Sequence, residues 1–199
     1  MLLERCSAIK ELNLSGTYVS AGIFSYCSHL HRLHMPKCRS LSTVEFGDAD
    51  FEMQRLSIYS CVNLKTVSLN LPRLSNLNLS SNKQLATLHI VAPHLHHLNL
   101  SGCNLLANAD FSVPALATVN LYNCRSLLPN ALSTLFTSSR HTLTHVFACG
   151  MIQMTDVQVN AFVQQCTSLE TFDVTGCRAL SSTMQGSLNR IIQTNREVS

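Results

Sequence analysis

Histidine and cysteine are the residue types in this sequence that could do chemistry, with nine of each among 199 residues. The histidines gather in two clusters, His29-x-His31-x-x-His34 and His94-x-His96-His97. Imidazole and thiolate are ligands that zinc prefers, and zinc needs its ligands about 2.0–2.3 Å from one point. A thiol beside a histidine could instead act as a nucleophile, for which His145 and Cys149 are the candidate pair.

An internal repeat decides how these residues can meet. Apolar residues recur at offsets 0, +3 and +5 of a unit, and the +8 position is most often Cys or Asn. Eight units start near residues 9, 30, 53, 74, 95, 116, 143 and 169, so the period is 21 to 27 residues. In a strand, residues at +3 and +5 point to one side, while those at +2, +4 and +6 point to the other. One unit cannot bury its apolar side alone, so stacked units must share a core.

The repeat predicts an α/β solenoid, a leucine-rich-repeat horseshoe of about eight repeats that forms a single domain over residues 1–199. Short parallel strands should line one face. In the middle of the chain, a second apolar stripe in each unit and a proline at the 21-residue period (Pro72, Pro93, Pro114) predict extended segments on the return side. Helical spacing predicts helices toward both ends, over residues 20–27, 130–138 and 156–165, with Thr155 as a cap, and a closing helix over about 183–193.

On this fold the chemical candidates separate. His34 and His97 share a face but lie three strands apart, roughly 14 Å, and His96 and His97 point to opposite sides of their strand. His145 and Cys149 lie four residues apart on one strand, roughly 13 Å, whereas a working dyad needs about 3 Å. The acidic residues of one local cluster fall in a loop region: Glu45, Asp48, Asp50 and Glu52. We therefore expect no enzyme, no metal site and no cofactor.

Most cysteines follow the repeat. Those at +8 are Cys38, Cys61, Cys103, Cys124 and Cys177, with Asn82 in the same column, and Cys6, Cys27 and Cys166 stand three residues before a unit start. A thiol there fills space as a small hydrophobe and makes weak hydrogen bonds to the backbone. Cys149 is the exception, because it takes an outward position. An odd count that follows the repeat is not a disulfide framework, so we expect a reducing compartment, the cytoplasm or the nucleus.

Composition narrows the class of partner. The net charge is only +3 with 13% charged residues, and the basic residues form no run, so we expect no nucleic acid partner. No window approaches the ~20 apolar residues of a membrane span, and the first residues lack a signal-peptide pattern, so we expect no membrane association. The open N-terminal end of the solenoid could support weak self-association.

The outward positions of the strands should form the binding face. Eight strands give a face roughly 38 Å long, enough for a standard interface of about 800 Å² per partner. Side chains at these positions predict a protein partner, with the candidate contacts Arg32, His34, Arg55, Tyr59, His97, Tyr122, His145 and Phe147. The triplets that begin at Asn13, Asn78 and Asn99 match the N-glycosylation pattern, but they coincide with the repeat itself.

The last repeats carry a family resemblance. Met154-Thr155-Asp156-Val157, then Cys166-Thr-Ser-Leu169, and Gly176-Cys177 resemble the cysteine-containing repeats of F-box/leucine-rich-repeat proteins, and Leu98-Asn-Leu-Ser-Gly-Cys103 has the same character. That resemblance implies a substrate receptor of a cullin–RING ubiquitin ligase (SCF), which holds its target on the repeat face. The ligase subunits would be reached through an F-box, which needs some forty residues before the repeats, whereas here the repeats start near residue 6.

Two other functions fit the same repeats. The chain could be a standalone cytosolic leucine-rich-repeat scaffold or regulatory protein without a ligase link, and co-purification with a cullin complex would separate this from the first reading. An extracellular recognition receptor would need a signal peptide and paired cysteines, which disfavours it.

Overall fold

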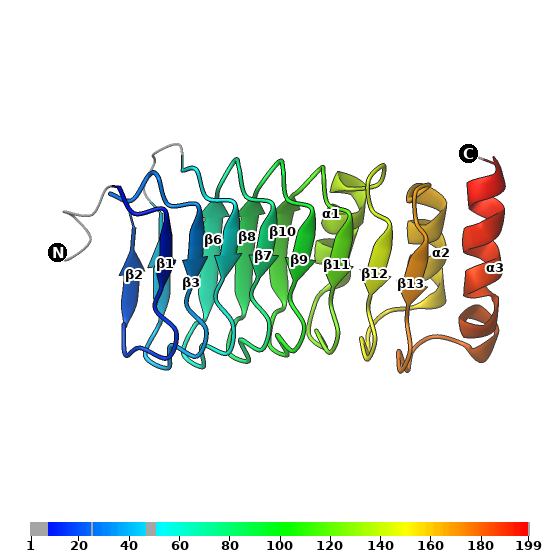
Figure 1. The fold of residues 1–199 in the computed structure, drawn as a ribbon. Helices are drawn as coiled ribbons and strands as arrows, with labels where there is room; N and C mark the ends of the chain where they lie inside the picture. Colours follow the sequence, from blue (N-terminus) through cyan, green and yellow to red (C-terminus); the bar gives the residue numbers. More distant parts are fainter. Residues whose placement is uncertain (1–7, 25, 47–50, 199) are drawn as a thin grey trace.

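The structure, a computed structural model, describes residues 8–24, 26–46 and 51–198. Its chain winds into a solenoid of stacked parallel strands, with β1 and the helix α3 at opposite ends of the long axis (Figure 1). Eight strands form one parallel sheet in chain order. They are β1 (Glu11–Asn13), β3 (Arg32–His34), β5 (Arg55–Ser57), β7 (Asn76–Asn78), β9 (His97–Asn99), β11 (Thr118–Asn120), β12 (His145–Phe147) and β13 (Thr171–Asp173).

Each strand of this sheet begins two residues after one of the eight unit starts read from the sequence. The central residue of each strand is the +3 position, such as Leu33 or Leu98, and it points into the core while its neighbours face outward. The register follows the repeat: Leu33 lies beside Leu56, and Leu77 beside Leu98. The apolar stripe therefore stacks into one continuous core, as the period predicts.

A residue in the left-handed backbone conformation follows every strand of the sheet, at the +7 position. The eight residues have φ between 58° and 75°: Gly16, Lys37, Ser60, Ser81, Gly102, Asn123, Gly150 and Gly176. This conformation lets the turn continue the parallel ladder, because the N–H of Gly102 donates to the carbonyl of Tyr122 in the next unit. Half of these positions are glycine, the residue that pays least for positive φ.

The return side is extended in the middle of the chain. Strands β6 (Thr66–Asn70), β8 (Thr87–Val91) and β10 (Asn108–Ser112) form a three-stranded parallel sheet behind the eight-stranded one (Figure 1). These are the segments in which the second apolar stripe predicts extended structure. Nearer the N-terminus, β2 (Ala21–Ile23) pairs in parallel with β4 (Thr43–Glu45).

The helix predicted over residues 20–27 is wrong, because β2 occupies that segment. Its residues alternate exposed, buried and exposed, and Ile23 remains 54% exposed instead of facing the core as a helix would place it. Gly22 lies against the ring of Phe24, where a Cβ would come within 2.7 Å. The return segment of this unit is therefore extended like those in the middle, and helices are confined to the C-terminal part of the described chain.

The longer C-terminal units have room for helices. α1 (Pro129–Ser138) and α2 (Asp156–Gln165) take the return side, and α3 (Ser182–Val198) packs on β13 and α2 at the end (Figure 1). These match the three C-terminal helices read from the sequence, although α3 is longer. The predicted cap at Thr155 forms through the side chain of Gln158, whose Oε1 accepts from the Thr155 N–H at 2.9 Å. Leu188 and Ile192 of α3 are buried, so this helix covers the last strand.

None of the helices that the structure describes is long and apolar enough to cross a bilayer.

Candidate functional site

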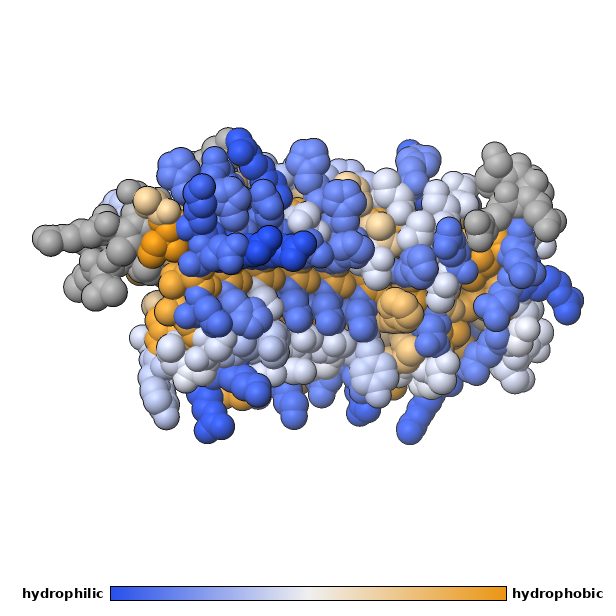
Figure 2. Space-filling view, in the orientation of Figure 1, coloured by the Kyte–Doolittle hydropathy of each residue, from blue (hydrophilic) through white to orange (hydrophobic). Residues whose placement is uncertain are grey.

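A groove of about 710 Å³ runs along the outer face of the eight-stranded sheet. It crosses seven strands, from β1 to β12, and follows the outward residues at +2 and +4 of each unit. Its floor is formed at the +3 positions, by residues such as Leu33 and Leu98, whose side chains lie in the core and which are only 1% and 2% exposed. Figure 2 shows this floor as a continuous hydrophobic stripe between two rows of hydrophilic residues. The site is thus a trench with an apolar floor and polar walls.

The +2 wall carries the charges of the groove. Arg32 and Arg55 lie side by side in register on β3 and β5. Arg32 forms an ion pair with Glu11 on β1 at 2.9 Å, whereas the guanidinium of Arg55 makes no hydrogen bond or ion pair with any described residue. Along the wall the next residues are Asn76 and His97. Glu11 is the single acidic side chain among the described residues that line the groove, so its N-terminal half is positive.

Four of the seven +4 residues in the lining are asparagines, and we call this side of the groove the asparagine wall; His34, Ser57 and Phe147 hold the other positions. The Oδ1 atoms of Asn78, Asn99 and Asn120 each accept a hydrogen bond from the backbone N–H two residues later, at 3.0 Å. Asn13 makes the same contact at 2.9 Å, and Asp173 does so on β13 at 3.0 Å. Each side chain therefore closes the turn that ends its strand, as Asx turns do. This role explains why the Asn-x-Ser triplets recur with the repeat.

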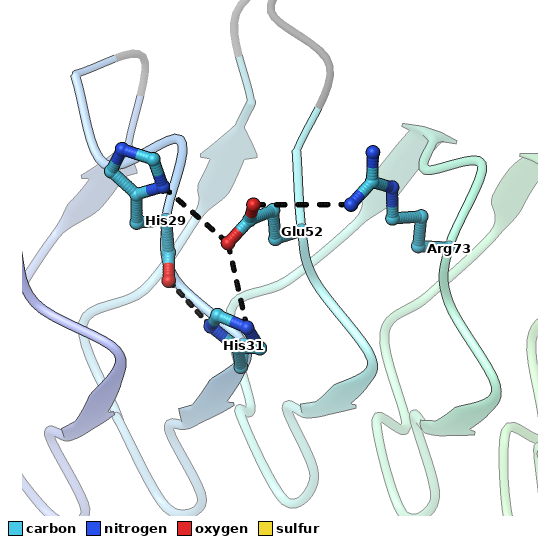
Figure 3. Close-up of polar contacts among 4 residues, drawn as sticks. All are labelled: His29, His31, Glu52 and Arg73. Atoms are coloured by element: carbon cyan, nitrogen blue, oxygen red, sulfur yellow. Dashed lines mark hydrogen bonds and ion pairs between the residues drawn. The ribbon is translucent and has the colours of Figure 1, made fainter.

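A cluster of polar side chains lies in the segments that lead into β3, β5 and β7 (Figure 3). The Glu52 carboxylate meets His29 Nδ1 and His31 Nε2, each at 3.4 Å, and Arg73 at 3.8 Å. The Nδ1 of His31 also contacts the carbonyl of His29 at 2.7 Å, and because a carbonyl only accepts, this nitrogen donates. Glu52 thus joins three turns of the chain.

The structure places five of the eight predicted contact residues in the groove lining: Arg32, His34, Arg55, His97 and Phe147. The other three lie outside that lining. Tyr59 packs edge-on against His34, with ring centroids 5.9 Å apart. Tyr122 is 51% exposed in the turn after β11. His145 on β12 contacts Glu170 at 3.9 Å. The five residues in the lining extend from β3 to β12, so the groove joins the N-terminal arginines to Phe147 along one face.

The cysteines at +8 are buried, and each thiol donates a hydrogen bond to a backbone carbonyl of the preceding unit. The thiol of Cys103 donates to the carbonyl of Leu79 at 3.2 Å, and that of Cys124 donates to Leu100 at 3.1 Å. The others make the same contact with the preceding unit: Cys38 with Leu14, Cys61 with Met35 and Cys177 with Ala148. Burial raises the pKa of Cys61 and of Cys103 to about 11. Cys27 and Cys166 are buried as well, while Cys6 lies outside the described residues.

Cys149, the outward thiol, sits half-buried beside Asp173. Burial, then the hydrogen bond and charge of Asp173, raise its pKa to about 11. A thiol with that pKa is protonated at neutral pH, which disfavours it as a nucleophile. Hydrogen bonds from Thr175 and Cys149 lower the pKa of Asp173 in turn.

The candidate metal ligands and the acidic residues of the predicted cluster do not come together in one site. Among the described residues no group of three or more His, Cys, Asp or Glu side chains could hold a metal ion. His34 and His97 lie on β3 and β9, with β5 and β7 between them. Of the acidic cluster, Glu45 ends β4 and Glu52 lies in the cluster with His29 and His31, while Asp48 and Asp50 lie outside the described residues.

The bonding of the asparagine wall is the feature of the groove that sequence reasoning missed. The recurrence of Asn at +4 in four units was visible, but only the contacts show that each Oδ1 is already engaged.

Comparison with known proteins identifies no family: no protein-family model matches this chain, and no curated protein matches it either.

Proposed function

We propose that this chain is a protein-recognition module that binds its partner in the groove of the eight-stranded sheet. The observation that carries the proposal is the groove itself, an apolar trench whose two walls present arginine, histidine and asparagine side chains. These side chains stand on strands anchored by a continuous core, so they are held in place before a partner arrives. Preorganised polar groups around an apolar floor are typical of binding surfaces.

We also propose that the solenoid is a leucine-rich-repeat horseshoe of eight repeats, of the cysteine-containing kind. Three regularities support this: a strand in each unit, a left-handed residue at +7, and a buried thiol or Asn82 at +8 in six units. No disulfide joins the cysteines of the described residues, which supports a reducing compartment such as the cytoplasm or nucleus.

The ligase role is the finer form of this proposal. The resemblance of residues 154–177 to F-box-associated repeats favours a module that selects targets for ubiquitin transfer. The alternative is a scaffold or regulatory protein that binds the same kind of partner without a ligase. Co-purification of the full gene product with a cullin and its adaptor would establish the ligase role, and a partner retained without any ligase subunit would establish the alternative.

A pair of matched substitutions tests the groove. Ser57→Tyr places a ring in the groove on β5, and His89→Tyr places one on the return-side sheet, where His89 is exposed. A true partner should lose at least about tenfold in affinity with the first variant and keep its affinity with the second. Alanine at Tyr59, Tyr122 or Phe147 then asks whether the aromatic residues contribute. A partner that binds both tyrosine variants equally would refute the groove as the site.

A further inference from the structure

We propose that the occupant of the groove is an acidic peptide segment bound in an extended conformation, an inference that rests on the proposed recognition function. Three observations carry it: the hydrogen-bonding capacity left on the +4 wall, the charge balance of the +2 wall, and the spacing between the walls.

The asparagine wall offers amide donors, and each of its amide oxygens already accepts a hydrogen bond. The Oδ1 atoms of Asn78, Asn99 and Asn120 accept hydrogen bonds from the backbone of their own turns. The Nδ2 groups of these asparagines make no hydrogen bond with any described residue. A row of N–H donors with engaged oxygens selects a ligand rich in acceptors, such as carboxylates and peptide carbonyls.

The charges select the same chemistry. Arg32 and Arg55 stand in adjacent register, an arrangement of like charges that is unfavourable until an anion lies between them. Glu11 reaches Arg32 from the far side, and Arg55 has no anionic partner among the described residues. Guanidinium pairs well with carboxylate through two parallel hydrogen bonds. A carboxylate above β3 and β5 would therefore complete this wall.

The dimensions select an extended chain. The two walls are two residues apart along each strand, roughly 6.6 Å, which is narrower than an α-helix with its side chains, about 10–12 Å. The seven strands that line the groove span roughly 29 Å at the usual spacing, which about nine extended residues would cover. Single-stranded nucleic acid is held by stacking platforms, and Phe147 is the single Phe, Tyr or Trp among the described lining residues. An extended acidic peptide fits both the width and the chemistry.

Fluorescence anisotropy on the full chain tests the proposal. The probe is a labelled peptide of about nine residues that alternates Glu and Ser, compared with the same peptide carrying Gln for Glu and with an oligouridine of similar length. The Glu peptide should bind at least about tenfold more tightly than the Gln peptide. Its affinity should fall as the salt concentration rises from about 50 mM to about 300 mM, because exposed charges are screened.

Substitutions that preserve the turns identify the groups that bind. Asn99→Asp keeps the Oδ1 that closes the turn, as Asp173 does naturally on β13, but replaces the donor with a negative charge. It should weaken the Glu peptide at least about fivefold, and so should Arg55→Gln. Asn108→Asp makes the same charge change at an exposed position of β10 on the return side and should leave the affinity unchanged.

The outcomes separate this inference from the proposed function. Equal binding of the Glu and Gln peptides, no binding of either, or an Asn99→Asp variant with unchanged affinity would overturn the acidic-peptide inference. Tighter binding of the oligouridine would replace the peptide by a nucleic acid. The proposed function fails separately, when a native protein partner is indifferent to Ser57→Tyr.

Discussion

The side chain of Asn82 ties its own turn of the solenoid to the turn that holds Cys61. Its Oδ1 accepts a hydrogen bond from the backbone N–H of Cys61 at 2.8 Å, and its Nδ2 donates to the carbonyls of Ile58 at 2.7 Å and Leu79 at 2.8 Å. Asn82 is fully buried. At the same position in five other units a cysteine thiol donates to one carbonyl of the preceding unit, whereas the Asn82 amide bonds three backbone groups.

Two replacements of Asn82 should therefore lower the free energy of unfolding by different amounts. Asn82→Ala leaves the Cys61 N–H and the Ile58 carbonyl without their partner, while the Leu79 carbonyl keeps the Cys103 thiol. It should lower the free energy of unfolding by about 2–3 kcal/mol. Asn82→Cys restores a thiol donor as in the neighbouring units and should lose less, about 1 kcal/mol. Urea unfolding of both variants measures the difference. Equal losses would show that burial of an amide, and not its bonds, determines stability at this position.

Glycine in the left-handed turn should resist substitution. Gly102 has φ of 75°, and a Cβ there would meet Ser81 only at ordinary contact distance, so the penalty of Gly102→Ala is conformational. We expect a loss of about 1 kcal/mol in the free energy of unfolding. Gly186 is the matched control, because it lies inside α3 with open space around it, and Gly186→Ala should stabilise by up to about 1 kcal/mol. Thermal melts of both variants should shift in opposite directions.

Stability should fall in alkaline solution because of the buried thiols. Burial raises the pKa of Cys61, Cys103 and Cys166 from 9.0 to about 11 in the folded chain. The unfolded chain releases these protons first, so the stabilisation is complete below pH 9 and is lost as the pH rises toward 11. Chemical unfolding at a series of pH values measures the slope. Cys103→Ser, whose hydroxyl does not titrate there, should show a shallower decline, and an unchanged slope would argue against this cause.

Phe136 should anchor the C-terminal units. Its ring stacks on Phe162 with centroids 4.1 Å apart and also meets Phe172 at 5.9 Å, which joins α1, α2 and β13. Phe136→Ala should cost about 3–5 kcal/mol of unfolding free energy. Phe147→Ala removes an equal ring from the half-buried groove wall and should cost about 1 kcal/mol or less. Guanidinium unfolding of both variants shows which of the two rings packs the core, and similar losses would contradict this division.

The positions of the strands could be predicted because each inward residue is set by local alternation. Leu33 and Leu98 stand at +3 of their units, and an extended backbone sends such residues to one side whatever lies next to them. The C-terminal helices were equally visible, since Val159 and Phe162 have helical spacing and the longer units have room for a helix. Residues 20–27 misled the prediction because Ile23 and Phe24 fit a helix as well as a strand. A short apolar run does not separate the two.

The sequence alone determined the solenoid, its unit boundaries and the outward face, because these depend on spacing within one unit. Only the tertiary structure decided what that face offers a partner. The bond between Arg32 and Glu11, and the convergence of His29, His31 and Arg73 on Glu52, join residues about one or two periods apart, so their meeting depends on register between turns. The asparagine wall presents N–H donors because the geometry of each turn brings a backbone N–H to the Oδ1 atom. The presence of asparagine in the sequence does not reveal this hydrogen bond.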